Sequence, residues 1–74
     1  MGRKKVDPLL KTILGYAGAL GLEGDALAVK VGIPKTTLWR RLKDPDKFTR
    51  SELEHIRIRL GIPVEEMQEA VIRR

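Results

Sequence analysis

The polar side chains with the most evident chemistry lie between Lys35 and Lys43. If this segment is a helix anchored inward by Leu38, Thr36 and Arg40 point away from the core. Arginine carries a planar fork of donors that bridges O6 and N7 of guanine, and threonine offers a hydroxyl to several bases or a methyl group to thymine. Thr36 and Arg40 are therefore candidates for contacts with base edges, and Arg40 is the stronger one.

Further cationic side chains flank this segment and are suited to phosphates. The chain has 15 Lys and Arg against 10 Asp and Glu, a formal net charge of +5, which indicates an anionic partner. We expect residues 1–6 to form a basic, flexible arm that reaches the DNA backbone or an adjacent minor groove. The residues predicted at the backbone or flank of a bound duplex are Arg3, Lys4, Lys5, Thr37, Trp39, Lys43, Lys47 and Arg50.

The elements that position these side chains are predicted to be five short helices in an all-α bundle, formed by residues 7–74 as one helix-turn-helix domain. Apolar residues recur at helical spacing over residues 8–20, 24–31 and 35–42, a fourth helix starts at Thr49, and a fifth follows Pro63. We expect Tyr16 and Phe48 at the core or its edge. The apolar residues assigned to inner faces are Leu9, Leu10, Ile13, Leu14, Ala17, Leu20, Leu27, Ala28, Val31, Leu38, Leu42, Leu53, Ile56, Leu60, Val64, Met67, Ala70 and Val71.

Local signals mark the ends of these helices. Asp7 precedes a proline, which suits an N-cap followed by the first helical residue. Thr49 and Glu52 form a capping box, in which the Thr hydroxyl and the Glu carboxylate each satisfy a backbone N–H. The glycines expected to end helices are Gly21, Gly32 and Gly61.

The second and third predicted helices have the pattern of two short helices that cross steeply. Such a crossing needs a small residue where the backbones meet, a glycine to turn the chain, and apolar inner faces. Ala28 and Gly32 meet the first two needs. The apolar residues that meet the third are Leu27, Val31, Ile33 and Leu38.

From Leu9 to about Met67 the chain resembles the Cro and repressor family of phage-type helix-turn-helix proteins, with a lambda-repressor-like DNA-binding fold. The segments 27–42 and 49–67 look like that family's helices two to five. The resemblance implies operator binding by a phage or prophage repressor, and it places Lys35 and Thr36 at the end of the helix that enters the groove. The sequence departs from the family pattern at Gly24, where Gln or Ser is common, and at Arg41, where the family has an inward apolar residue.

Composition excludes several other classes of protein. With no cysteine there is no disulfide framework and no thiolate for zinc, and His55 has no partner for metal binding or catalysis, so we expect no enzyme, metal or cofactor. No stretch approaches the length of a membrane helix, and we expect a cytoplasmic protein without a small-molecule effector. Arg40 and Arg41 could instead form a solvated face, and Trp39 could pack on the surface rather than contact DNA.

One helix contacts too few base pairs to select an operator from a genome, which favours two copies on a pseudo-palindromic duplex. Ile58 and Ile72 fall outside the inner stripes of their helices, so they are either isolated surface residues or a homodimer contact. A protein-interaction module, such as an antitoxin-like or adaptor domain, is the alternative to a DNA-binding regulator.

Overall fold

The computed structural model describes residues 7–73, which form five α-helices and no strand. In chain order these are α1 Pro8–Ala19, α2 Asp25–Val31, α3 Lys35–Lys43, α4 Arg50–Leu60 and α5 Val64–Ile72, with a 3-10 turn, η1 Pro45–Lys47, before α4. The predicted all-α fold is confirmed, and the predicted helices start and end within about one residue of the observed ones. The predicted arm, residues 1–6, lies outside the described residues.

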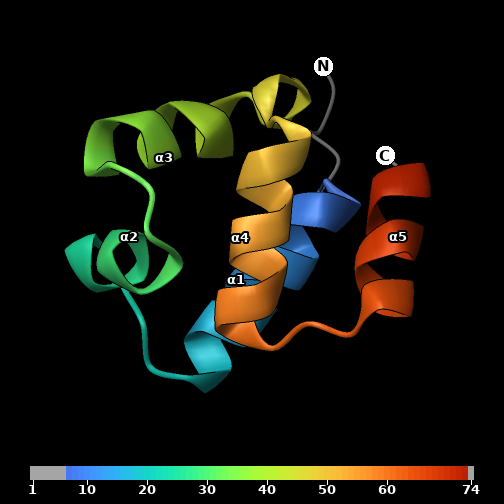
Figure 1. Ribbon diagram of the computed structural model, residues 1–74, viewed down its shortest axis with the longest axis horizontal. Coiled ribbons are helices and arrows are strands. Elements are labelled where there is room, and N and C mark those ends of the chain that lie inside the picture. The colour runs from blue at the N-terminus through green and yellow to red at the C-terminus, as the bar shows by residue number, and fades with distance from the viewer. Residues whose placement is uncertain (1–6, 74) are drawn as a thin grey trace, which may run out of the picture.

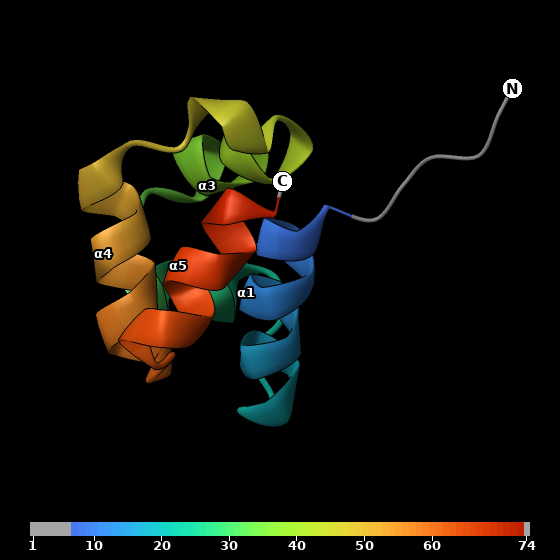
Figure 2. The ribbon, with the colours of Figure 1, turned by 90° about the vertical axis from the view of Figure 1, so that its right-hand side faces the viewer.

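The helices surround one core, with α1 and α4 at its centre (Figure 1). The helix α5 packs mainly against α1, whereas α2 packs against α4 and α3. Seen from the side, α3 and η1 lie across one end of the molecule, and the chain runs from η1 into α4 at that end (Figure 2). Within residues 7–73 no helix combines the length and apolar character needed to cross a membrane.

The predicted caps set the helix boundaries. The Asp7 carboxylate accepts a hydrogen bond from the Leu9 backbone N–H at 2.8 Å, which starts α1. At α4 both halves of the capping box are present: the Glu52 N–H donates to the Thr49 hydroxyl at 3.1 Å, and the Thr49 N–H donates to the Glu52 carboxylate at 2.9 Å. Gly61 ends α4 with a φ of 74°, a left-handed conformation that a residue with a Cβ adopts only under strain.

The core draws on every helix, but it is narrower than the sequence pattern predicts. Thirteen apolar side chains are buried, and Tyr16 and Phe48 pack against them as expected. Four residues assigned to inner faces are instead exposed: Leu14, Leu20, Val64 and Val71.

These four errors have three physical causes. In α1 the buried stripe is centred on Ile13, and Leu14 lies about 100° further around the helix, where it is 48% exposed. Leu20 follows the last residue of α1, so the helical spacing no longer places its side chain on the buried stripe. Because α5 packs mainly against a single helix, Met67 and Ala70 are buried while Val64 and Val71 remain at the margins.

A tight turn joins α2 to α3. Gly32 ends α2 at a φ of 73°, and its N–H donates to the Ala28 carbonyl at 3.0 Å. Ile33 is buried directly after this glycine, and the Leu38 N–H donates to the Pro34 carbonyl at 2.8 Å as α3 begins. The turn therefore holds α3 at the rim of the core, with one side packed and the other exposed.

Candidate nucleic-acid interface

Leu38 determines which face of α3 is exposed. Its side chain is fully buried, and Leu42 packs on the edge of the core one turn later. Residues two positions away on a helix lie about 160° around its axis, so Thr36 and Arg40 point away from Leu38. Both are exposed, as the sequence predicts.

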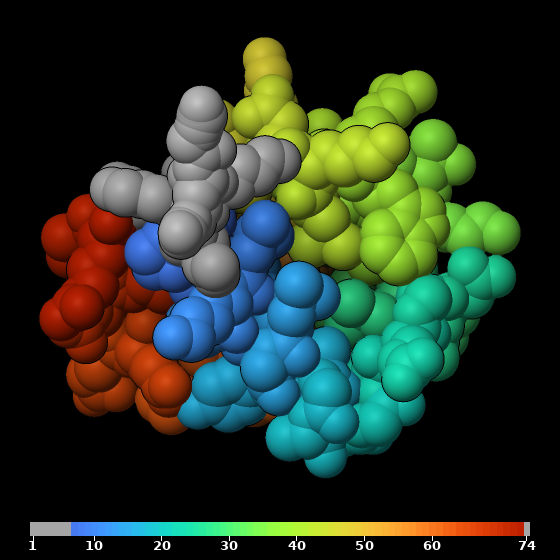
Figure 3. Space-filling model, turned by 180° about the vertical axis from the view of Figure 1, so that it is seen from behind, coloured from blue at the N-terminus to red at the C-terminus, as the bar shows by residue number. Residues whose placement is uncertain are grey.

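Five of the predicted contact residues meet in one shallow hollow beside α3. It is lined by Asp25 of α2 and by Lys35, Thr36, Trp39, Arg40 and Lys43 of α3. In the space-filling view α3 occupies an edge of the molecule, where its side chains project from the surface (Figure 3). We call this surface the α3 face.

Three predicted contact residues lie elsewhere. Thr37 is half-buried and does not line the hollow. Lys47 ends η1 and Arg50 begins α4, so both follow α3 along the same end of the molecule and are exposed. The predicted contacts Arg3, Lys4 and Lys5 fall outside the described residues.

Among the described residues, most basic side chains at the end of the molecule formed by α3, η1 and the start of α4 are unpaired. Over residues 35–50 the chain carries six basic side chains and two acidic ones. Within the range 7–73, no hydrogen bond or ion pair engages the side chains of Arg40, Lys43, Lys47 or Arg50. Arg57 and Arg73, by contrast, pair within their own helices with Glu54 at 2.6 Å and Glu69 at 3.0 Å. Of the other described cations, Lys11, Lys30 and Arg59 also have no side-chain hydrogen bond or ion pair. The end formed by α3, η1 and the start of α4 therefore holds four of the seven unpaired cations within residues 7–73.

Asp25 adds one negative charge to the α3 face. Its Oδ2 lies 3.4 Å from Nζ of Lys35, and both side chains are well exposed. Exposed pairs of this kind contribute little free energy because water screens them. Lys35 is thus on the predicted face but is shared with an acidic neighbour.

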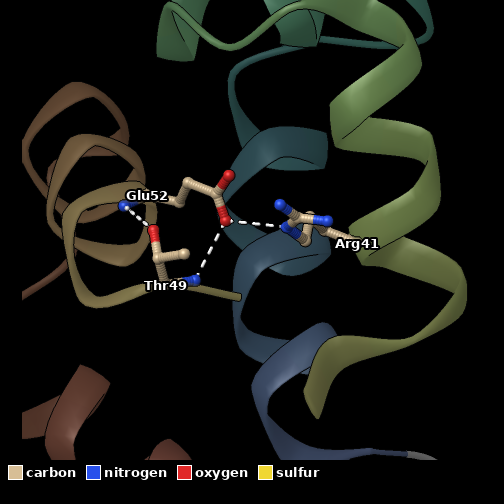
Figure 4. A network of polar contacts seen from close by, with 3 residues as sticks. All are labelled: Arg41, Thr49 and Glu52. Atoms are coloured by element: carbon tan, nitrogen blue, oxygen red, sulfur yellow. Dashed lines mark hydrogen bonds and ion pairs between the residues drawn. The ribbon is translucent and has the colours of Figure 1, made fainter. Parts of the chain in front are cut away.

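Arg41 has a role that sequence reasoning missed. Its Nε donates to Oε1 of Glu52 at 2.9 Å, the same oxygen that accepts the Thr49 N–H (Figure 4). The hydrogen bond from Arg41 is the main reason why the pKa of the Glu52 carboxyl lies below its ordinary value of 4.5. The interpretation of Arg41 as part of a solvated face is therefore wrong. The available signal was its position three residues after Leu38, on the packed side of the helix.

Trp39 is 38% exposed and borders the hollow, and it is not among the side chains that pack against the core. Its indole is therefore accessible from the α3 face. His55 is exposed on α4. Residues 7–73 contain no group of His, Asp or Glu side chains arranged to hold a metal ion.

Ile58 and Ile72 are both exposed, as predicted, at 59% and 80%. They line neighbouring hollows that share Arg50 and Glu54, and the hollow beside Ile72 lies between α4 and α5. Its other lining residues include Leu53, Met67, Gln68 and Val71. We call this second surface the α4–α5 face.

No family model, curated protein or solved structure matches the chain. The functional case accordingly depends on the two surfaces themselves.

Proposed function

We propose that this protein is a sequence-specific regulator of transcription that binds double-stranded DNA, with α2 and α3 acting as a helix-turn-helix. The observation that carries the proposal is the α3 face, where Thr36, Arg40 and Lys43 are exposed together and the two cations have no ion pair within residues 7–73. A helix with its side chains is about 10–12 Å across, which matches the width of the major groove.

The contacts divide by chemistry. Arg40 bridges two acceptors of a guanine, and Thr36 and Lys35 contact neighbouring bases from the start of α3. Lys43, Lys47 and Arg50 neutralise phosphates beyond the other end of α3, and Trp39 and Thr37 lie at its flanks. The basic residues Arg3, Lys4 and Lys5 add further contacts to the backbone or minor groove.

A single copy reads only a short site. Nine residues of α3 extend over roughly 13 Å at 1.5 Å per residue, about four base pairs. We therefore propose that two copies bind a pseudo-palindromic operator, with half-sites about 34 Å apart and the α4–α5 face, including Ile58 and Ile72, as their contact. The protein would then act as a phage or prophage-type repressor in a bacterial cytoplasm.

Selection of bound duplexes from a random pool tests the proposal with the full chain. We expect enrichment of one motif with two-fold symmetry. The absence of an enriched motif, together with no binding of any duplex at low salt, would refute a DNA-binding role.

One observation favours a second candidate, a protein-interaction module of the antitoxin-like or adaptor kind. The α4–α5 face exposes Ile58, Val71 and Ile72, a set of apolar side chains that a partner protein could cover. Capture of a protein partner that is lost with Ile72→Asn, without any DNA shift by the same preparation, would support this alternative.

A further inference from the structure

We infer that Arg41 is a positioning residue, which sets the orientation of α3 on the protein through its ion pair with Glu52 and does not itself contact DNA. The inference rests on the proposed function, because it concerns how the α3 face is presented to a duplex. The two adjacent arginines thus have different roles: Arg40 contacts bases, and Arg41 makes a contact within the protein.

The first argument is that α3 has few other attachments. Leu38 is fully buried, whereas Leu42 is only partly buried. No side chain caps the start of α3 among the described residues, because Pro34 stands at the N-cap position. A helix anchored by so little apolar contact can rock about its buried residue, and a shift of this kind would move Arg40 relative to a base edge.

The second argument is the position of the ion pairs that tie α3 to its neighbours. Within residues 7–73 there are two: Lys35 pairs with Asp25 of α2 at 3.4 Å, and Arg41 pairs with Glu52 of α4 at 2.9 Å. The Lys35 pair is open to solvent, at 58% and 72% side-chain exposure, while the Arg41 pair is at 24% and 17%. Because a duplex on the α3 face competes with Asp25 for Lys35, the less exposed Arg41 pair is the tether that we expect to persist in a complex.

The third argument is that the acceptor is itself held in place. The Glu52 carboxylate accepts the Thr49 N–H at 2.9 Å within the capping box, so its rotamer is determined before Arg41 binds (Figure 4). Arg41 thereby connects α3 to the first turn of α4. The same turn carries Arg50, a proposed phosphate contact. The Arg41–Glu52 pair therefore fixes the position of the base-contacting residues of α3 relative to this phosphate contact.

The test compares variants of the full chain for binding to a selected duplex and to a random duplex, over a range of salt concentrations. Arg41→Met removes the guanidinium but keeps an apolar stem, and Glu52→Gln keeps an acceptor for the capping box but removes the charge. We expect each to lose about tenfold in the ratio of selected to random binding, without a change in salt slope. The double variant should lose no more than either single variant, and Arg41→Lys should recover part of the loss.

For Glu52→Gln, the direction of the change in DNA affinity distinguishes the two explanations. If Glu52 acted only as a negative charge near DNA, its removal would tighten binding to every duplex. Tighter binding to both duplexes would overturn the inference. So would a salt slope that falls by about one in Arg41→Met, because that result marks a phosphate contact.

Thr49→Ala is the matched control for stability, since it removes the cap hydroxyl but leaves Arg41 and Glu52 intact. We expect it to lower the unfolding temperature without changing the ratio of selected to random binding. Amide hydrogen exchange reports on α3 directly: exchange should rise across α3 in Arg41→Met and not in Thr49→Ala, and equal exchange in the two would overturn the inference. The wild-type chain alone decides the proposed function, because failure to bind any duplex refutes DNA binding whatever the variants do.

Discussion

Lys35 and Asp25 connect the starts of α3 and α2 through an ion pair, with 3.4 Å between Nζ and Oδ2. The pair places the negative charge of Asp25 on the α3 face, beside the residues proposed to contact DNA. Binding of a duplex must therefore separate Lys35 from Asp25 or bring a phosphate close to the carboxylate. Both events cost free energy, so Asp25 should weaken binding that depends on charge alone.

We accordingly predict that Asp25→Asn strengthens binding to all duplexes by about threefold at low salt, the range expected for one exposed ion pair. The gain should shrink as salt is added. Glu23→Gln is the control. The substitution removes the same charge, but Glu23 is exposed and does not line the hollow. Equal gains in the two variants would mean that net charge, and not the Lys35 pair, is responsible.

Arg40 and Lys43 should differ in the kind of binding that they support. Arg40→Ala should weaken the selected site by about 10- to 100-fold and random DNA little, since a bidentate contact with a guanine is lost. Lys43→Ala should weaken both duplexes alike and lower the salt slope by about one. Electrophoretic shifts at several salt concentrations measure both quantities. A uniform loss for Arg40→Ala would contradict its role in base contacts.

The features that the sequence predicts well are local ones. The capping box needs only Thr49 and Glu52, three residues apart, and the end of α4 needs only a glycine at Gly61, so both follow from short-range chemistry. The exposed position of Arg40 likewise follows from its spacing to Leu38. Fold class and the α3 face are therefore accessible from the sequence alone.

The features that it misses depend on contacts between helices. Ile13 and Leu14 have equal hydrophobic character, and their difference in burial arises because other helices cover one side of α1. Arg41 meets Glu52 across eleven positions in the sequence, and no periodicity relates them. Periodicity indicates an apolar stripe, but the neighbouring elements set its width and supply the partners of polar side chains.

Glu52 should contribute to stability in a way that depends on acid pH. Its pKa in the folded protein is lowered from 4.5, chiefly by Arg41. Its contribution is therefore fully present above the unfolded value and is lost as the pH falls through the lower folded value. Thermal unfolding between pH 7 and pH 2 should show a shallower acid loss in Glu52→Gln than in wild type. Parallel curves for the two proteins would contradict this assignment.

Tyr16 should show the opposite dependence at alkaline pH. Its hydroxyl donates to Glu66 and connects α1 to α5, and this hydrogen bond is the main reason why the pKa of Tyr16 is raised above 10.0. The contribution is present below the unfolded pKa and is lost as the pH rises through the folded one. The chain has a single tyrosine, so its ultraviolet absorbance titration reports this group directly. Glu66→Ala removes the acceptor and should return the titration toward the ordinary value, and an ordinary value already in wild type would disprove the shift.

Ile72, on the α4–α5 face, should matter only when two half-sites are bound together. Ile72 is 80% exposed, so Ile72→Asn should leave folding stability within about 0.5 kcal/mol of wild type. If Ile72 lies in a contact between two copies, the variant should bind an isolated half-site normally but lose about tenfold or more on a duplex with both half-sites, because binding of the second copy is no longer assisted. Val29→Asn is the control, since Val29 is 81% exposed on α2 and does not line this face. Sedimentation of the protein–DNA complexes gives the number of bound copies, and an equal loss in the two variants would argue against a dimer contact at Ile72.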